Sequence, residues 1–294
     1  MSDRFKSILV TGADGRLGSE IKDLEHYYSN YKILFVGKSK LDITCRRKLD
    51  KFFKSQKIDI IINCAAYTNV IRAEAEVDVV EAVNVLAVGN LAKLAKKYSI
   101  KLIHISTNDV FDGQKTNPYN EVDDTNPVNV YGQSKLDGEK LMVSVNPKNS
   151  VIIRTSWVYS KHGNNFVKSM IRLASEKKAI RVVNDQFGTP TSAVDLASLI
   201  MKILPEIFSP GVEIYHYSNE GSTSWFEFSK EIFLQLGFKY SVQPVSTSDY
   251  GEAVERPTTT VLNKRKIKES FEINIPYWKV SLGTFIKELE QTRR

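Results

Sequence analysis

The stretch SILVTGADGRLG, residues 7–18, decides the fold. A short apolar run leads into three glycines spaced three apart, Gly12, Gly15 and Gly18, and an amphipathic segment follows. In such a turn the first glycine permits a sharp reversal, the second lets the backbone approach a pyrophosphate, and the third lets helix and strand pack closely. The strand–turn–helix setting favours a dinucleotide site over a tight turn without a ligand.

The first half of the chain repeats the same alternation of strand and helix. Amphipathic stretches, the longest at residues 75–99, separate continuous runs of Val, Ile and Leu. Such runs between helices indicate a parallel sheet covered on both faces. The expected strands span residues 7–12, 31–37, 58–66, 100–107 and 149–159.

The pattern changes after about residue 159, where longer loops rich in Pro, Thr and Asn join shorter elements. We therefore predict an α/β fold: a Rossmann-like, doubly wound parallel sheet with a smaller, interleaved C-terminal α/β substrate lobe. Residues 1–158 form the nucleotide-binding domain, and residues 159–294 form mainly the substrate lobe. A strand and helix within 184–218 return to the first domain.

Composition narrows the classes of function. The chain has 294 residues, 42% hydrophobic and 26% charged, which is typical of an ordinary soluble globular protein, and no apolar run suits a membrane span. Few apolar residues precede the glycine turn, so we expect a first strand there and no signal peptide. Cys45 and Cys64 lack metal-ligand spacing, so we predict no metal site and a cytoplasmic location.

The net charge of +7 can attract nucleic acid, a membrane surface or a phosphorylated small molecule. The basic residues are scattered, and the densest cluster, residues 264–268, is typical of the solvated face of a short helix. We therefore expect a phosphorylated cofactor or substrate, with neither nucleic acid nor membrane as a partner.

The end of the second strand bears on the choice of cofactor. NAD-specific sites commonly place a carboxylate there for the ribose 2′-hydroxyl. This chain instead has Lys38, Ser39 and Lys40, which with Arg16 could meet a 2′-phosphate. The sequence favours NADPH, with NADH also accepted; alternatively, the lysines are only exposed loop charges.

Tyr131 and Lys135 lie four residues apart, so on a helix they share one face. Tyrosine is a poor acid–base catalyst unaided, because its pKa lies near 10, and we expect a nearby ammonium group to lower it. Tyr131 could then protonate a carbonyl oxygen, and Thr107, at the end of a strand, could orient that oxygen. A Tyr-x-x-x-Lys pair alone is common helix-surface chemistry.

The order of the glycine triplet, NCAA, ISTNDVFDG and YGQSKLDGE resembles the extended short-chain dehydrogenase/reductase superfamily. More specific stretches are similar to the dTDP-4-dehydrorhamnose reductase family, and together they cover nearly the whole chain. These stretches are LDIT (41–44), INCAAYTNV (62–70), NPVNVYGQSKLDGE (126–139), IIRTSWVY (152–159), NNFVKSMIRLA (164–174), NDQFGTPTSAVDLA (184–197) and ERPTTTVL (255–262).

The resemblance implies reduction of the C4 keto group of a nucleotide-linked 4-keto-6-deoxy sugar, with dTDP-4-dehydrorhamnose converted to dTDP-L-rhamnose. It implies a catalytic set of Thr107, Tyr131 and Lys135. Trp157 would face the sugar, and Asn165 and Arg256 would lie on the nucleotide-sugar side. The implied cofactor residues, with Lys38 added from the argument above, are Gly12, Gly15, Arg16, Leu17, Gly18, Lys38, Asp42, Ile43, Ala65, Ala66, Tyr67, Tyr131 and Lys135.

Three positions depart from the family pattern. Asn108 stands where an acid is usual, Asp109 where an aromatic residue is usual, and Ile71 where an aspartate is usual. These changes would fall on the substrate side, at Asn108 and Asp109 above all, so a different nucleotide keto-sugar stays open as the substrate, as does neutral drift in a tolerant loop.

A further alternative is an NADP-binding regulatory subunit without catalysis, although retention of Thr107, Tyr131 and Lys135 argues against it. A homodimer is compatible with the sequence.

Overall fold

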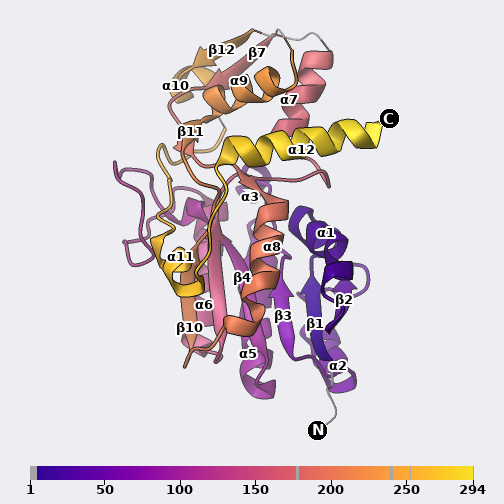
Figure 1. The fold of residues 1–294 in the computed structure, drawn as a ribbon. Coiled ribbons are helices and arrows are strands. Elements are labelled where there is room, and N and C mark those ends of the chain that lie inside the picture. The colour runs from indigo at the N-terminus through magenta and orange to yellow at the C-terminus, as the bar shows by residue number, and fades with distance from the viewer. Residues whose placement is uncertain (1–4, 177–178, 239–240, 252, 294) are drawn as a thin grey trace.

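The computed structural model describes residues 5–176, 179–238, 241–251 and 253–293, and its centre is a parallel sheet of six strands (Figure 1). The strand order is β2-β1-β3-β4-β5-β10, and every neighbouring pair is parallel. The predicted doubly wound sheet is confirmed. Its strands are β1 Lys6–Thr11, β2 Tyr31–Val36, β3 Ile60–Asn63, β4 Lys101–Thr107, β5 Ser150–Thr155 and β10 Val212–His216.

Alternation along each strand explains why both faces are covered. Ile8 and Val10 enter one hydrophobic cluster, whereas Leu9 enters the other. Ile60 and Ile62 likewise point to the first face and Ile61 to the second. Because successive side chains on a strand point to opposite faces, each strand supplies apolar groups to two helical layers.

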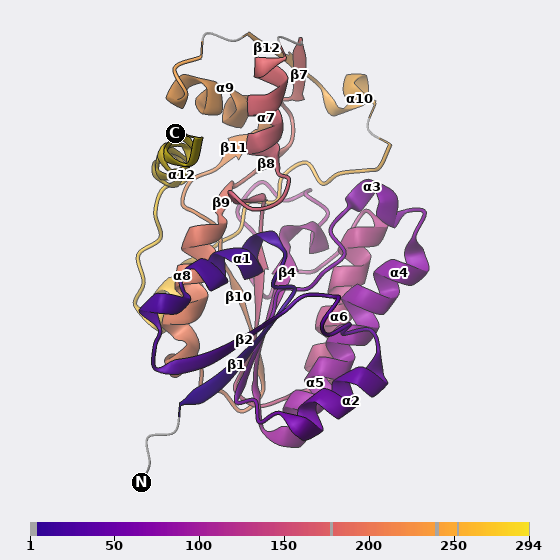
Figure 2. The ribbon, with the colours of Figure 1, turned by 90° about the vertical axis from the view of Figure 1, so that its right-hand side faces the viewer.

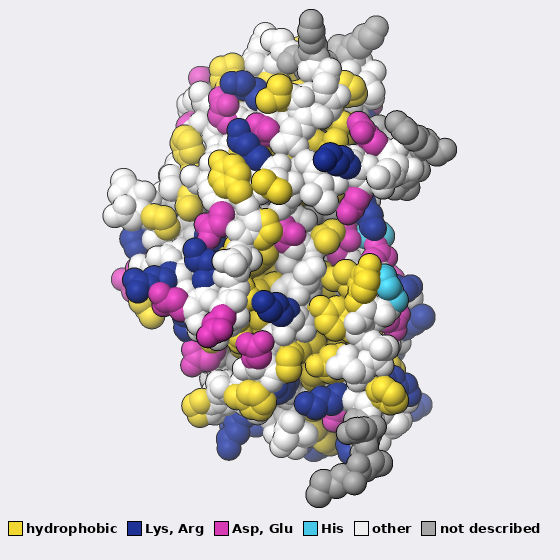
Figure 3. Space-filling view, in the orientation of Figure 1, with side chains coloured by type: hydrophobic (Ala, Val, Ile, Leu, Met, Phe, Trp, Pro, Cys, Tyr) yellow, Lys and Arg dark blue, Asp and Glu magenta, His cyan; other side chains and the backbone are white. Residues whose placement is uncertain are grey.

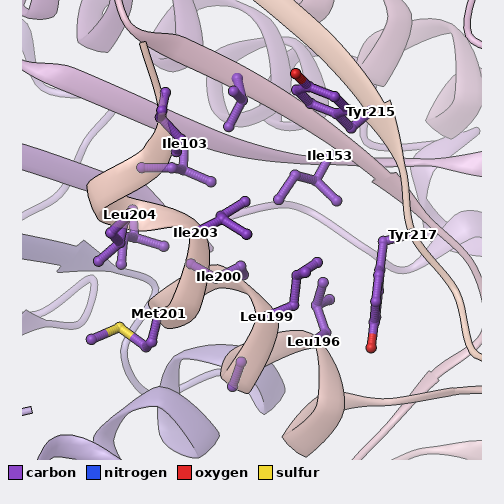
Figure 4. Close-up of a cluster of buried hydrophobic side chains, with 14 of the residues drawn as sticks. Ile103, Ile153, Leu196, Leu199, Ile200, Met201, Ile203, Leu204, Tyr215 and Tyr217 are labelled. Carbon is purple, nitrogen blue, oxygen red and sulfur yellow. The ribbon is translucent and has the colours of Figure 1, made fainter. Parts of the chain in front are cut away.

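Helices cover the two faces as separate layers (Figure 2). The first layer includes α8, whose Leu and Ile side chains lie against β4, β5 and Tyr215 of β10 (Figure 4). This first layer consists of α1 Arg16–Asp23, α8 Ala193–Ile203 and α11 Arg265–Phe271. The second layer consists chiefly of α2 Arg46–Ser55, α5 Ala87–Tyr98 and α6 Val130–Val145. Shorter helical segments are η1 Glu25–Tyr27, α3 Val70–Ala73, α4 Val77–Glu81, η2 Ala82–Leu86, η3 Asn108–Val110 and η4 Leu204–Glu206.

A second lobe lies beyond the carboxyl ends of the sheet strands, with a hydrophobic cluster of its own around Tyr159, Phe228 and Trp278 (Figures 1 and 2). Its strands form short pairs: β6 with β9, β7 with β12, and β8 with β11. The elements are β6 Val158–Tyr159, α7 Phe166–Ser175, β7 Ile180–Val183, β8 Phe187–Gly188, β9 Thr191–Ser192, β11 Thr223–Ser224, α9 Trp225–Gln235, β12 Val242–Val245, α10 Thr247–Tyr250 and α12 Trp278–Arg293.

Two predicted elements are interrupted. The expected strand at 149–159 leaves the sheet after Thr155, because Trp157 adopts a left-handed conformation (φ 46°) and β6 then pairs with β9. The expected helix at 75–99 contains the π-helical stretch η2, where one residue is in excess of the α-helical repeat. Neither interruption has a signature in the apolar pattern.

The basic cluster at residues 264–268 differs in part from a solvated helix face. Lys264 is buried and lies 3.4 Å from a carboxylate oxygen of Glu220, while Ile267 enters the first hydrophobic cluster. Elsewhere on the face in Figure 3, Lys and Arg alternate with Asp and Glu. Among the described residues, no helix is long and apolar enough to cross a membrane.

Arg154 of β5 and Glu139 of α6 form a buried ion pair that fastens this helix to the sheet. The guanidinium Nη2 lies 2.7 Å from one carboxylate oxygen, and both side chains are at most 4% exposed. Arg154 Nε also donates to both carboxylate oxygens. Breaking such a pair leaves an uncompensated charge in the interior.

We expect Glu139→Gln to lower the free energy of unfolding by about 3 kcal/mol or more, because Arg154 keeps its buried charge without a counter-charge. Urea denaturation measures this loss. The matched control is Glu269→Gln, since Glu269 pairs with Arg265 while both stay largely in solvent, and it should leave the midpoint unchanged. Equal effects of the two substitutions would contradict the assignment.

Candidate active site

A cavity of about 700 Å³ lies between the carboxyl ends of the sheet strands and the second lobe. The glycine loop, the ends of β4 and β5, the first turns of α6, and the second lobe all contribute to its wall. This edge is where open parallel sheets bind ligands. Predicted residues that line the cavity are Gly15, Arg16, Leu17, Ala66, Thr107, Asn108, Asp109, Tyr131, Lys135, Trp157 and Arg256.

The glycine loop has the close contacts that a pyrophosphate site needs. Gly12 has φ +64°, and a Cβ on it would lie 2.5 Å from the backbone nitrogen of Ala65. A Cβ on Gly18 would lie 2.5 Å from the carbonyl oxygen of Gly12. Helix α1 begins after Gly15 without a side-chain cap, so its N-terminal N–H groups are left for an anion. The loop therefore fits a dinucleotide.

Arg16 lies elsewhere than the sequence suggests. Its Nη1 donates to the carbonyl oxygen of Val158 at 2.9 Å, so it spans the cavity toward the second lobe. Burial lowers the pKa of its guanidinium, and its charge acts on Tyr131. The expected pairing of Arg16 with a 2′-phosphate beside Lys38 does not match this position.

The end of β2 carries a carboxylate from another part of the chain. A Cβ on Gly37 would collide with the carboxylate of Asp14, so this acid from the glycine loop lies directly over the strand end. Lys38 is exposed there. The Asp42 carboxylate accepts hydrogen bonds from the backbone nitrogen of Thr44 at 3.0 Å and from the Thr44 hydroxyl at 2.7 Å. Ile43 is buried in the second hydrophobic cluster. Asp14 was not among the cofactor residues predicted from the sequence, although its place between two glycines of the loop was a usable signal.

Residues 65–67 follow β3 at the carboxyl edge of the sheet, where Ala66 lines the cavity, and Asn84 fixes the backbone of Tyr67 there. Its amide accepts from the backbone nitrogen of Tyr67 at 2.9 Å and donates to the Tyr67 carbonyl and the Ser134 hydroxyl, both at 3.0 Å. The Tyr67 phenol turns away to donate to Glu76 at 2.7 Å. Asn84 lies in the π-helical stretch, where sequence gave no signal.

Thr107 and Tyr131 are brought together as predicted. The Thr107 hydroxyl lies beside the Tyr131 phenol, whose pKa it acts to lower, and accepts from the backbone nitrogen of Asp109 at 3.2 Å. Burial, with the Asp109 charge as a second cause, raises the pKa of Tyr131 to about 12, against the lowering effect of Thr107, Arg16 and Arg256. The expected lowering of this pKa by Lys135 is wrong, so the phenol is held in its protonated form.

Lys135 is 1% exposed, and two groups of β4 contact its ammonium group. Its Nζ donates to the carbonyl oxygen of Ile105 at 2.7 Å and lies 3.3 Å from Nε2 of His104. Burial lowers the pKa of Lys135 to about 8, against the opposing charge of Glu139. The sequence search missed His104, whose signal was a polar residue inside an apolar strand.

The predicted substrate residues have different surroundings. Trp157 lines the cavity and stacks on Trp225, with ring centroids 3.6 Å apart. Arg256 also lines the cavity, on a loop far away in sequence. Asn165 does not line it: its amide accepts from the backbone nitrogen of Lys168 and donates to the carbonyl of Ser160 at 2.6 Å, so it caps α7.

The three residues that depart from the family pattern do not lie together in the structure. Asn108 and Asp109 line the cavity, with the Asn108 amide 2.5 Å from the hydroxyl of Thr260. Burial raises the pKa of Asp109 against the charge of Arg256. Ile71, on α3, is 57% exposed and is not part of the cavity wall. Only the pair at 108–109 therefore bears on a ligand there.

One group of side chains has the composition of a metal site. Glu20, Asp23 and His162 offer ligand atoms within 4.8 Å of one another. Lys161 Nζ lies 2.9 Å from the Asp23 carboxylate, and the Ser160 hydroxyl donates to Glu20 at 2.6 Å. The ammonium already balances part of the negative charge, so this geometry assigns no ion.

The fold and the Thr–Tyr–Lys cluster beside a glycine loop define an extended short-chain dehydrogenase/reductase. Residues 6–291 match the family model described as the RmlD substrate binding domain. The chain belongs to the dTDP-4-dehydrorhamnose reductase family, as the sequence predicted.

Three relatives illustrate the family. The chain is 38% identical over 284 residues to a dTDP-4-dehydrorhamnose reductase of Aggregatibacter actinomycetemcomitans, covering 94% of this chain and 96% of the relative. It is 34% identical to a dTDP-4-keto-6-deoxy-D-glucose reductase of Streptomyces niveus, covering 96% of each. A crystal structure of the Bacillus anthracis dTDP-4-dehydrorhamnose reductase in complex with NADP superposes with a TM-score of 0.91 at 38% identity, covering 97% of this chain and 100% of that one.

We expect Gly12→Ala to weaken binding of NADPH about tenfold or more, a loss of about 1.4 kcal/mol or more, because the new methyl group would press the glycine loop away from Ala65. Isothermal titration measures the affinity. Gly237→Ala is the matched control: Gly237 has φ +68°, but a Cβ there meets nothing within 4 Å. This control should lose about 1–2 kcal/mol of stability and keep its affinity. Unchanged affinity in Gly12→Ala would contradict the pyrophosphate assignment.

Proposed function

We propose that this protein is an NADPH-dependent reductase of a nucleotide-linked 4-keto-6-deoxy sugar, with dTDP-4-dehydrorhamnose reduced at C4 to dTDP-L-rhamnose. One observation carries the proposal: Thr107, Tyr131 and Lys135 line the same cavity as the glycine loop. The family relationship supplies the substrate class, since the A. actinomycetemcomitans relative is a dTDP-4-dehydrorhamnose reductase. This reaction feeds rhamnose or a related deoxysugar into surface polysaccharide.

Bound NADPH would supply the hydride that adds to C4 of the sugar. The residues of this chain handle the proton and the charge. Tyr131, kept protonated by its raised pKa, donates its phenolic proton to the C4 oxygen. The Thr107 hydroxyl, which lies beside this phenol, orients the same oxygen. The resulting phenolate is stabilised by the positive charges of Arg16 and Arg256, which both favour ionised Tyr131.

Lys135 adds a buried positive charge one helical turn from Tyr131. Two groups below it, the Ile105 carbonyl and His104, hold its Nζ, and the side chain also forms part of the cavity wall. A charge in this position suits the ribose hydroxyls of the cofactor and stabilises negative charge that develops nearby. Its position is therefore set before any ligand binds.

On the substrate side, Arg256 would bind the diphosphate, because its planar guanidinium pairs with two oxygens at once. Trp157 would contact the sugar ring, and Trp225, stacked behind it, fixes its indole plane. Asn108 and Asp109 complete this wall. Asn165 contributes by fixing the start of α7.

NADPH is the proposed cofactor, and NADH is also accepted. Lys38 offers a positive charge for a 2′-phosphate, whereas Asp14 offers a carboxylate beside the same strand end, which suits a free 2′-hydroxyl. The B. anthracis relative was crystallised with NADP. We place the activity in the cytoplasm, where reduced cofactor is available, and a homodimer stays a prediction for solution studies.

A second candidate is the same chemistry on another nucleotide keto-sugar. Asp109 favours it, because a carboxylate that faces Arg256 and Tyr131 alters charge where the ligand binds. The S. niveus relative is named for a different ketone, dTDP-4-keto-6-deoxy-D-glucose.

We expect Tyr131→Phe to bind NADPH normally but to lose turnover by about 100-fold or more, because the proton donor is removed while the ring remains. NADPH oxidation with dTDP-4-dehydrorhamnose measures this loss. The control Tyr217→Phe removes a phenol outside the cavity wall and should keep full activity. Full activity in Tyr131→Phe would remove Tyr131 from the reaction.

For the choice of sugar, we expect Asp109→Asn to change the ratio of kcat/KM values across a panel of dTDP-, UDP- and GDP-linked 4-keto sugars. The amide keeps the shape of the side chain but removes the charge that acts on Arg256 and Tyr131. Asp137→Asn, at a side chain that is 41% exposed on the same helix as Tyr131, is the control and should leave the ratios unchanged. If the ratios for Asp109→Asn equal those of the unmodified enzyme, Asp109 does not select the sugar.

A further inference from the structure

A row of three polar side chains crosses the sheet beneath the active site. Thr11 is the register partner of Asn63, and Asn63 is the register partner of His104. The Thr11 hydroxyl lies 2.6 Å from Oδ1 of Asn63, and Nδ2 of Asn63 lies 3.0 Å from Nδ1 of His104. The row ends at Lys135, whose Nζ lies 3.3 Å from Nε2 of His104.

The whole row is buried, and only its Lys135 end reaches the cavity wall. Thr11 and His104 are 0% exposed, and Asn63 and Lys135 are each 1% exposed. All three strand residues point to the face covered by α5 and α6, where Leu9, Ile61 and Leu102 surround the row at the preceding positions of the same strands. Polar groups buried this deeply are costly unless each hydrogen bond is made, so the donors and acceptors must match along the row.

This matching couples the row to the charge of Lys135. An ammonium group only donates hydrogen bonds, so charged Lys135 requires a lone pair on Nε2 of His104. The imidazole proton is then on Nδ1, and Asn63 must turn its amide oxygen toward it and its NH₂ toward Thr11. This is a half-turn of the amide from its orientation in the structure, where Nδ2 faces Nδ1 and the Thr11 hydroxyl donates to Oδ1. With uncharged Lys135, every bond reverses: Nε2–H donates to the amine, and the Asn63 amide donates to Nδ1.

We propose that His104 is a positioning residue for Lys135: its Nε2 accepts a hydrogen bond from the ammonium group and thereby sets the pH at which Lys135 loses its proton. Once the Asn63 amide has made that half-turn, its oxygen accepts from Nδ1–H, its NH₂ donates to the Thr11 hydroxyl, and the imidazole is held in the tautomer that this bond needs. The proposal deepens the proposed function, because the same ammonium group serves the reductase site.

Among the described groups near Lys135, His104 is the side chain placed to accept a hydrogen bond from its ammonium group. From β4 only His104 and the Ile105 carbonyl reach Nζ among the contacts described. From its own helix Glu139 favours the charged form, but Arg154 of β5 pairs with that carboxylate. On the cavity side Tyr131 precedes Lys135 by one helical turn, with Asp109, Arg16 and Arg256 around its phenol. The neighbouring imidazole also opposes its own protonation, since burial and the Lys135 charge lower the pKa of His104.

Two matched substitutions separate the contacts of His104. His104→Gln places an amide near the position of Nε2 and keeps a partner for Lys135, whereas His104→Asn places it near Nδ1 and keeps only the contact with Asn63. We expect His104→Asn to lower the pKa of Lys135 by about one unit, because a hydrogen bond to the charged form is lost. His104→Gln should stay within a few tenths of a unit of the unmodified protein.

Two readouts are used. The first is NMR titration of ¹³C-lysine-labelled protein without ligands, with the Lys135 signal identified by its loss in Lys135→Met. The second is the pH at which NADPH-dependent turnover falls as the solution becomes alkaline. Asn63→Asp tests the opposite direction: its carboxylate only accepts, keeps the proton on Nδ1, and should raise the pKa. It also serves if His104→Asn fails to fold.

The control is His216→Asn. His216 is equally buried and lies 3.5 Å from Arg154 and 3.1 Å from the Tyr119 carbonyl, away from Lys135. It should lose stability without moving the Lys135 titration. If His104→Asn and Asn63→Asp both leave the pKa of Lys135 unchanged, or if His104→Gln moves it as far as His104→Asn, the proposal is overturned.

The two readouts distinguish this proposal from the proposed function. Movement of the NMR titration in a protein that turns over no keto-sugar would support the role of His104 and overturn the reductase assignment. If His104→Asn turns over the keto-sugar normally, and its activity falls at the same alkaline pH as that of the unmodified enzyme, the reductase assignment is supported and the role of His104 is overturned.

Discussion

The parallel register of β1, β3 and β4 is the constraint on which the rest of the site depends. Register sets Thr11 and Asn63, at the carboxyl ends of β1 and β3, side by side with His104 in the middle of β4. The same edge carries the glycine loop after β1 and Thr107 at the end of β4. Because all three strands run in one direction, the groups that follow them meet at one edge, and a shift of one residue would turn each polar side chain to the other face.

Burial then sets the protonation states of the site. It raises the pKa of Tyr131 and lowers that of Lys135, since an apolar environment disfavours the charged form of either group. For a reductase this combination is useful, because the acid keeps its proton until charge develops on the substrate. The lysine stays mostly protonated at neutral pH, since its pKa remains near 8.

The second lobe supplies what the sheet cannot. The loop at 253–260 brings Arg256 and Thr260 against η3, where Thr260 bonds Asn108 across 152 positions of sequence. The stacked pair Trp157 and Trp225 closes another side of the cavity. Charge and shape around the ligand therefore depend on how two lobes meet, whereas the proton donor and its partners belong to the sheet domain.

The sequence by itself determined the features that local geometry controls. Apolar runs fixed the parallel sheet, the glycine spacing fixed the phosphate loop, and a four-residue interval placed Tyr131 and Lys135 on one helix face. The tertiary structure alone decided that Arg16 reaches Val158 and that the pKa of Tyr131 is raised. It also decided that a polar row reaches Lys135, because neighbours across strands, burial and the surrounding charges depend on contacts between residues far apart in the chain.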